Sequence, residues 1–218
     1  MSFSDLYVRL IEDIDYSEII DFIKPHLKKD HEILDAGCGS GVILVPLIQE
    51  GYRLTGIDID EDMLSYAHKA LNDTQTKLYI HDLKEPLGVE FDVILMFNDV
   101  INYFRGAKTV LKNLTKALKP EGFILFDFYK LDYLVEMDGY NESDTYPVSY
   151  SWQTQVNKNK LTHLIETDQE QYQVIQYLHE PSYYIEILES FGLYVEFMSG
   201  PDERKHYIKA IKKLIPLF

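Results

Sequence analysis

The sequence predicts an α/β fold in which a mostly parallel sheet of seven strands is flanked by helices and carries an antiparallel β insertion after the fifth strand. As far as Tyr129, short apolar segments alternate with segments of helical periodicity, which is typical of parallel strands joined by crossover helices. Beyond Tyr129 the pattern changes to alternation with period two, which indicates antiparallel strands. A length of 218 residues favours one domain over two independent ones.

The first elements surround a glycine-rich turn. Residues 17–29 place their apolar side chains on one helical face, which predicts a helix with Ser17 as its N-cap and with Pro25 kinking it or ending it early. A short apolar strand is expected at residues 31–37 and runs directly into glycine. Residues 42–51 then show helical periodicity, so we expect a strand, a glycine turn and a helix in this order.

The same alternation continues to the fifth strand. The further strands are expected at residues 52–60, 76–82, 91–97 and 122–128, and the further helices at residues 61–72 and 109–122. The strand at 91–97 is apolar apart from Asp92, which is typical of a strand buried on both faces of a sheet. Right-handed crossovers then put helices on both faces.

After the fifth strand the chain leaves this plan and later returns to it. Residues 135–147 are polar and rich in turn-forming residues. The elements expected beyond them are strands at 146–156, 160–168 and 172–179, a helix at 181–192, and strands at 193–199 and 206–213. We therefore expect residues 1–129 and 181–218 to form the core, and residues 130–180 to form an antiparallel lid insertion within the same domain.

Composition and charge limit the partners of this chain. Its 36 acidic and 21 basic residues give a formal net charge of -15, which disfavours nucleic acid because polyanions are repelled. The most basic segment, residues 205–213, alternates with apolar residues and is expected to form a solvated strand face. No stretch of 18 apolar residues is present, and charges interrupt residues 1–16, which therefore do not resemble a secretory leader; we expect a cytoplasmic protein without a membrane partner. Cys38 is the single cysteine, which excludes an internal disulfide and a cysteine zinc cluster.

The turn in ILDAGCGSGV carries three glycines at alternate positions, Gly37, Gly39 and Gly41. Ligands of open parallel sheets bind beyond the carboxyl ends of the strands, and glycines there let backbone N–H groups approach a ligand closely. A purely structural turn is the alternative. A dinucleotide fingerprint would need a third glycine where Val42 stands, and no G-K-[ST] follows, which excludes a P-loop.

Two acidic residues follow the next two strands at the same edge. Asp58 ends the second strand and can accept charge-assisted hydrogen bonds from the 2′- and 3′-hydroxyls of a ribose. Asp82 ends the third strand. With the glycine turn, these acids suit a ligand that has hydroxyls, an exocyclic amine and a positive charge.

In this combination the sequence resembles the class I S-adenosylmethionine-dependent methyltransferases. ILDAGCGSG is similar to their first motif, GIDIDEDML to their ribose-binding acidic loop, and HDLKEP to their adenine-contacting segment. The resemblance covers residues 31–128 and, more loosely, the terminal strands. It implies a Rossmann-like fold, S-adenosylmethionine as the cofactor, and methyl transfer as the reaction.

The resemblance also assigns the residues that hold the cofactor. Asp35 and the turn would hold the methionine part, Asp58 the ribose, Ile59 and Met63 the adenine faces, and Asp82 and Leu83 the adenine edge. The full set is Asp35, Gly37, Cys38, Gly39, Gly41, Asp58, Ile59, Met63, Asp82, Leu83 and Asn98. Three of these residues have structural alternatives: Asp35 could cap the turn, Met63 could belong to the core, and Cys38 could be only a small residue that a tight turn tolerates.

The acceptor side resembles a narrower group of small bacterial members. MFNDVINYF is similar to their D-S-L-N-Y segment, with Asp99, Asn102 and Tyr103 matching. Residues 3–16 resemble their opening helix, in which Tyr7 fits while Val8 replaces a usual aspartate. Amino-sugar N-methyltransferases share a similar layout, including an insertion after the fifth strand.

Asp99 is the first candidate for contacting or deprotonating the acceptor, with Tyr7 and Tyr103 near the methyl group. A plain helix cap is the alternative for Asp99. His163 and His179 lie in the insertion and could face the pocket, or could be ordinary strand residues. No set of carboxylates and histidines has metal-ligand spacing, so we expect no metal.

The insertion is rich in aromatic residues, namely Tyr140, Tyr146, Tyr150, Trp152, Tyr172 and Tyr177. Such rings could cover a cationic acceptor, pack within their own sheet, or form a dimer surface. Of these we favour a lid that decides substrate choice. Whether the protein is a monomer or a homodimer stays open.

The sequence therefore predicts methyl transfer to a small molecule, at nitrogen or oxygen rather than carbon, by in-line attack on the methyl group. An RNA acceptor such as tRNA, and a regulatory protein that binds S-adenosylmethionine without turnover, are the alternatives. A nucleotide-linked dehydrogenase is a more distant one. The acceptor itself, and whether a general base is used, do not follow from the residues.

Overall fold

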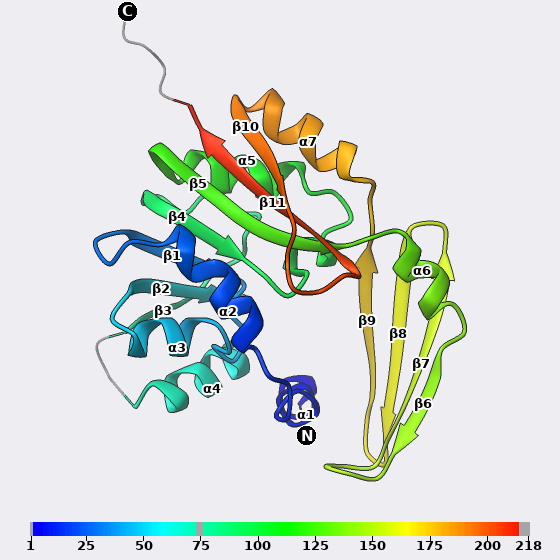
Figure 1. The fold of residues 1–218 in the computed structure, drawn as a ribbon. Coiled ribbons are helices and arrows are strands. Elements are labelled where there is room, and N and C mark those ends of the chain that lie inside the picture. The colour runs from blue at the N-terminus through cyan, green and yellow to red at the C-terminus, as the bar shows by residue number, and fades with distance from the viewer. Residues whose placement is uncertain (1, 73–75, 214–218) are drawn as a thin grey trace, which may run out of the picture.

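The computed structural model describes residues 2–72 and 76–213, so the end of the expected core segment, residues 214–218, lies outside the described residues. Its larger sheet has the strand order β10-β11-β5-β4-β1-β2-β3 (Figure 1). In chain order the strands are β1 (Glu32–Ala36), β2 (Arg53–Asp58), β3 (Lys77–Ile80), β4 (Phe91–Met96), β5 (Leu118–Tyr129), β10 (Leu193–Met198) and β11 (Lys205–Lys212). Neighbours among β1 to β5 pair in parallel, while β11 runs antiparallel to β5 and β10. The predicted seven-stranded, mostly parallel sheet is confirmed.

Helices cover both faces of this sheet, as expected. The helices are α1 (Phe3–Leu10), α2 (Ser17–Ile23), α3 (Leu44–Gln49), α4 (Glu61–Leu71), α5 (Lys108–Lys116), α6 (Asp132–Met137) and α7 (Pro181–Ser190), with short 3₁₀ helices η1 (Lys24–His26) and η2 (Val100–Tyr103). One core cluster joins the sheet to α5 and α7, and another joins it to α2, α3 and α4. Because Val93 and Ile94 of β4 lie in different clusters, this strand is buried on both faces. Among the described helices, none is long and apolar enough to cross a membrane.

Several helix boundaries differ from the predictions, and two of the differences have an identifiable cause. Ser17 is the first residue of α2 and not its N-cap, because Asp15 Oδ1 already accepts the Ser17 N–H at 2.8 Å. The fifth α-helix ends at Lys116 and β5 begins at Leu118, four residues before the expected start at 122. Leu118 pairs with Phe91 of β4, and a register shift follows before the regular pairing resumes at Phe123. A bulge of this kind leaves no period-two signal in the sequence.

The insertion forms a second sheet with the strand order β6-β7-β8-β9. Its strands are β6 (Asn141–Asp144), β7 (Tyr150–Asn157), β8 (Lys160–Thr167) and β9 (Gln171–Tyr177), all antiparallel. The segment expected to be polar and rich in turns, residues 135–147, contains β6 and the last three residues of α6. Leu134 and Met137 of α6 are buried against Leu161 and Leu178, so tertiary packing stabilises this short helix.

Helix α1 and the insertion sheet stand beyond one end of the parallel strands (Figure 1). The helix begins with a capping box between Ser2 and Asp5. Its side chains reach α4, where Tyr66 donates to Asp5 at 2.6 Å. On the other side the Phe3 ring lies 5.6 Å from the ring of Tyr172 in β9. Helix α1 therefore bridges the main sheet and the insertion sheet.

Candidate active site

The glycine turn is folded back against β2. The N–H groups of Gly37 and Cys38 both donate to the Ile57 carbonyl, at 2.8 and 2.9 Å. Gly37 has a φ of +81°, and a Cβ on it would lie 2.7 Å from Val100 Cγ1. Gly41 has a φ of +85°, and a Cβ on it would lie 2.9 Å from Val45 Cγ2. Both glycines are therefore required by backbone conformation and by close packing.

Asp58 holds the middle of this turn. Its Oδ2 accepts the Gly39 N–H at 2.8 Å, and its Oδ1 accepts the Asp60 N–H at 2.9 Å. Burial raises the pKa of Asp58, and the hydrogen bonds from Asp60 and Gly39 act in the opposite direction. Each carboxylate oxygen can still accept a further hydrogen bond. A Cβ on Gly39 would meet no atom within 4 Å, so the turn is open at this position.

Asp35 lies beneath the turn at the end of β1. Its residue surface is 3% exposed, and burial together with the charge of Asp58 raises its pKa to about 7. Among the described residues no backbone N–H donates to its side chain, which does not support the alternative that Asp35 caps the turn. Burial also raises the pKa of the Cys38 thiol, so this cysteine is not a thiolate at neutral pH.

A cavity of about 350 Å³ opens in front of the turn. The sequence-predicted residues that line it are Gly37, Cys38, Gly39, Asp58, Ile59, Met63, Asp82, Leu83 and Asn98, together with Tyr7 and Tyr103. Asp35, Gly41 and Asp99 do not line it. Side chains that the sequence did not indicate also contribute, among them Phe3 of α1, His81 and Phe104. Such aromatic wall residues follow no spacing rule.

The far wall of this cavity carries the groups expected at an adenine. Asp82 accepts the Lys84 N–H through Oδ1 at 2.9 Å, and the Leu83 carbonyl accepts from Asn113 Nδ2 at 3.1 Å. Ile59 is 67% exposed, whereas Met63 is 8% exposed and packs at the base of α4. Met63 thus lines the cavity while being largely buried. Asp60 caps α4 by accepting the Met63 N–H at 3.1 Å, as acidic residues commonly do at a helix N-terminus.

A second cavity, of about 430 Å³, lies beyond the ends of β4 and β5. It shares Tyr7, Ile11, Tyr16 and Asn98 with the first, so the two cavities adjoin. Burial, followed by the charge of Asp99, raises the pKa of Tyr7, which therefore stays a neutral phenol. Tyr103 stands on the side of the first cavity and is 46% exposed.

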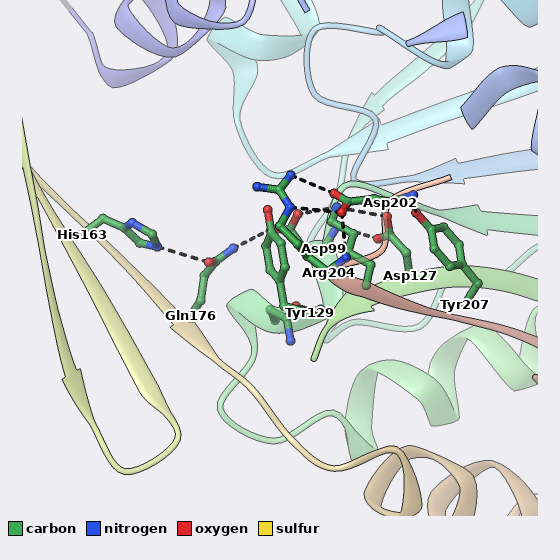
Figure 2. A network of polar contacts seen from close by, with 10 residues as sticks. Asp99, Asp127, Tyr129, His163, Gln176, Asp202, Arg204 and Tyr207 are labelled. Atoms are coloured by element: carbon green, nitrogen blue, oxygen red, sulfur yellow. Dashed lines mark hydrogen bonds and ion pairs between the residues drawn. The ribbon is translucent and has the colours of Figure 1, made fainter. Parts of the chain in front are cut away.

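Asp99 lies on the floor of this second cavity, where its carboxylate meets a buried lysine (Figure 2). Lys205 Nζ donates to Asp99 Oδ1 at 2.8 Å and to Asp127 Oδ2 at 3.1 Å. Asp127 Oδ1 also accepts the Asp99 N–H at 2.7 Å. Asp99 stands at the N-cap position of η2 but makes no side-chain capping bond, which does not support the helix-cap alternative.

Lys205 was missed by the sequence reasoning, and the expectation of a solvated face for residues 205–213 is wrong for it. The residue is 8% exposed because β11 lies between two strands and places Lys205 opposite Tyr129. One signal could have found it: Asp127 follows a fully apolar run, and a buried carboxylate requires a cation.

The two histidines of the insertion line neither cavity. His163 is buried between Trp152 and Gln176, at 3.1 and 3.2 Å. His179 stacks on Tyr183 with ring centroids 4.1 Å apart. Only His163 is connected to Asp99, through Gln176 (Figure 2).

Comparisons with known proteins agree with this geometry. The methyltransferase domain family matches residues 34–124. The chain is 30% identical over 168 residues to the protein named "Putative methyltransferase YqeM" of Bacillus subtilis (strain 168), and this alignment covers 73% of the chain and 68% of the relative.

Solved structures share the fold over nearly the whole chain. An S-adenosylmethionine-dependent methyltransferase from Clostridium acetobutylicum ATCC 824 has a TM-score of 0.80 at 20% identity, and 97% of each chain is covered. CalS10 of Micromonospora echinaspora, an amino pentose methyltransferase solved with S-adenosylmethionine bound, has a TM-score of 0.74 at 16% identity, with 98% of each chain covered. The chain therefore belongs to the class I S-adenosylmethionine-dependent methyltransferases, with S-adenosylmethionine as its cofactor.

Proposed function

We propose that the protein transfers the methyl group of S-adenosylmethionine to the nitrogen atom of a small-molecule amine held in the second cavity. The observation that carries this proposal is the charge of that cavity. Six carboxylates and two cations line it, an excess of four negative charges; the acids are Asp15, Glu18, Asp99, Asp127, Asp202 and Glu203, and the cations are Arg204 and Lys205. Such a lining attracts an ammonium group and repels an anionic acceptor.

Aromatic rings add to this preference. The phenol rings of Tyr7, Tyr16, Tyr129 and Tyr207 line the same cavity. A cation near an aromatic face gains about 0.5 to 2 kcal/mol, depending on how far it is desolvated. An amine with an apolar or ring skeleton therefore suits the second cavity better than an uncharged polyol does. The amino-sugar acceptors of the structural relatives are compatible with this proposal.

In the first cavity, the proposed contacts with the cofactor follow its lining. Asp58 would accept from the ribose hydroxyls, and the open turn around Gly39, with Cys38 and Asn98, would take the methionine part. Ile59 and Met63 would contact the adenine faces, while Asp82 and Leu83 would contact its edge. Asp35, Gly37 and Gly41 would act by shaping the turn. Two observations support this fit: the free lone pairs of Asp58 and the unobstructed side of Gly39.

The cofactor supplies a methyl group on a positively charged sulfur, so the chain needs mainly to align the acceptor and to exclude water. The shared wall formed by Tyr7, Ile11, Tyr16 and Asn98 would position the nitrogen between the cavities. An ammonium group must release a proton to the solvent before its lone pair can attack. The carboxylates of the second cavity would bind the charged form, and Tyr7, Tyr103 and α1 would close the junction. Residues 130–180 line neither cavity, so the insertion would influence the acceptor through the contact of Gln176 with Asp99.

A metabolite extract separated by charge tests this proposal. The purified protein is incubated with S-adenosylmethionine and with the cationic, neutral or anionic fraction, and S-adenosylhomocysteine is measured by mass spectrometry. We expect its formation only with the cationic fraction. Formation with the neutral fraction alone would assign an oxygen acceptor and overturn the nitrogen proposal. Cofactor binding without turnover in any fraction would instead favour a regulatory protein. The Asp58→Ala variant serves as the enzyme-dependent control.

A further inference from the structure

We propose that Lys205 and Gln176 are positioning residues of the acceptor site, which fix the Asp99 carboxylate and connect it to His163 and Trp152 of the insertion sheet. This inference rests on the proposed function only in that Asp99 faces the acceptor. Neither Lys205 nor Gln176 lines the first cavity.

The contacts form one continuous path between the two sheets. Gln176 Nε2 donates to Asp99 Oδ2 at 2.5 Å, and Gln176 Oε1 lies 3.2 Å from His163 Nε2. Trp152 Nε1 lies 3.1 Å from His163 Nδ1. Thr154 of β7 and Val174 of β9 both pair with His163, and residues two apart share a strand face. Trp152, His163 and Gln176 therefore lie on the same face of the insertion sheet, and Figure 2 shows Gln176 extending from it toward Asp99.

The direction of every hydrogen bond in this path is determined by its two ends. An indole N–H can only donate, so His163 Nδ1 must accept and His163 Nε2 must carry the proton. That proton is donated to Gln176 Oε1, which leaves the Gln176 amide group to donate to Asp99. A carboxylate oxygen can only accept, so the path ends there. Burial lowers the pKa of His163, in agreement with a neutral ring.

Lys205 completes the arrangement from the opposite side. Burial acts to lower its pKa, but the charges of Asp99 and Asp127 raise it well above the ordinary value, so the ammonium is retained. With Gln176 on Oδ2 and Lys205 on Oδ1, both oxygens of Asp99 already hold a donor. Asp99 is thus held in one orientation as a negative charge beside the acceptor, and each of its oxygens keeps a lone pair that can bind an ammonium group.

The backbone conformation at Asn98 and Asp99 is also held by Asp127 and Lys205. Asn98 and Asp99 have φ values of +57° and +52°, a left-handed conformation that is strained for non-glycine residues and needs support from its surroundings. Asp127 holds the Asp99 N–H at 2.7 Å, and Lys205 binds both carboxylates. The strained loop, the lysine and the insertion sheet therefore determine together where the Asp99 charge lies.

The Gln176→Leu variant tests the functional part, with Gln173→Leu on the exposed face of the same strand as its matched control. We expect both variants to bind S-adenosylmethionine within about twofold of wild type. In Gln176→Leu alone, the amount of cationic fraction needed for half-maximal turnover should rise about tenfold, since one charge-assisted hydrogen bond to Asp99 is lost. If Gln176→Leu needs the same amount of cationic fraction for half-maximal turnover as wild type does, the proposal is overturned.

Trp152, the only tryptophan of the chain, gives a second measurement that needs no turnover. Its indole N–H resonance in nitrogen-15 NMR should shift in Asp99→Asn, three side chains away, and should stay unchanged in Gln173→Leu. An unshifted resonance in Asp99→Asn would overturn the connection. If no extract fraction supports turnover, the proposed function fails while this resonance still decides the inference. Lys205→Arg, which keeps the charge, should retain the wild-type resonance, whereas Lys205→Met should shift it.

Discussion

At the scale of single residues, charge placement distinguishes the two cavities. Asp58 lines the first cavity, which we propose to hold the cofactor, and both of its oxygens accept from backbone N–H groups of neighbouring loops. Asp99 faces the acceptor cavity with both oxygens bonded to side chains. A carboxylate held by backbone is fixed by the local fold, whereas one held by side chains can be altered from distant strands. The first kind suits a cofactor common to a family, and the second suits an acceptor that differs among its members.

Replacing Asp58 by alanine should lower the affinity for S-adenosylmethionine at least tenfold, because each charge-assisted hydrogen bond contributes about 1.5 to 3 kcal/mol. The same change frees the Gly39 N–H that shapes the turn. Isothermal titration calorimetry measures the affinity. Asp62→Ala, on the exposed first turn of α4, is the control and should bind as wild type does. Equal affinities for the two variants would contradict the ribose assignment.

Asp35 should make the unfolding free energy depend on pH. Its pKa is raised to about 7 in the folded state by burial and by Asp58, so the protonated form is favoured. Its stabilising contribution is complete below the unfolded pKa near 4 and is lost as the pH rises to about 7. Relative to wild type, Asp35→Asn should therefore gain stability between pH 4 and pH 8, by up to about 4 kcal/mol. Urea unfolding at both pH values measures this, and parallel pH curves would contradict it.

At the scale of elements, periodicity made most of the fold predictable. Strands β1, β2 and β4 and helices α4 and α7 lie where apolar spacing indicated, because each has one or two buried faces of constant period. The exceptions depend on partners distant in sequence. Helix α6 is held by Leu161 and Leu178, and the early start of β5 depends on Phe91. Lys205 likewise needs Asp99, 106 residues earlier. No local pattern records such pairings.

The glycine turn is the element whose sequence and geometry are most closely linked. Gly37→Ala should cost about 1 to 3 kcal/mol in unfolding free energy, since its φ is +81° and the added Cβ would meet Val100 at 2.7 Å. Gly51 also has a positive φ, +88°, but has open space around it, so Gly51→Ala measures the cost of the backbone conformation without a clash. Val100→Ala should restore part of the stability that Gly37→Ala loses and none of the stability that Gly51→Ala loses. Urea denaturation measures the unfolding free energies. If the effects of Gly37→Ala and Val100→Ala simply add in the double variant, the added Cβ does not clash with Val100.

At the scale of the whole molecule, the insertion sheet is joined to the main sheet by a few buried polar side chains. One such connection is the Gln176 path, and a second is Asn102 of η2, which is fully buried. Asn102 Oδ1 accepts the Tyr129 N–H at the end of β5, and its Nδ2 donates to the Tyr177 carbonyl at the end of β9, both at 3.0 Å. The point where the chain leaves the core and the point where it returns are thus held by one side chain.

Asn102→Ala should therefore loosen the insertion more than it disturbs the core. Two backbone groups would lose their partner in a buried place, which costs about 1 to 3 kcal/mol for each group. We expect faster hydrogen exchange in β8 and β9 and little change in β1 and β4, because Asn102 bonds to the ends of β5 and β9 and to neither β1 nor β4. Asn157→Ala, at the exposed end of β7, is the matched control and should leave exchange unchanged. Uniformly faster exchange across both sheets would mean that the two sheets unfold as one cooperative unit, and that the acceptor side cannot be altered separately from the cofactor side.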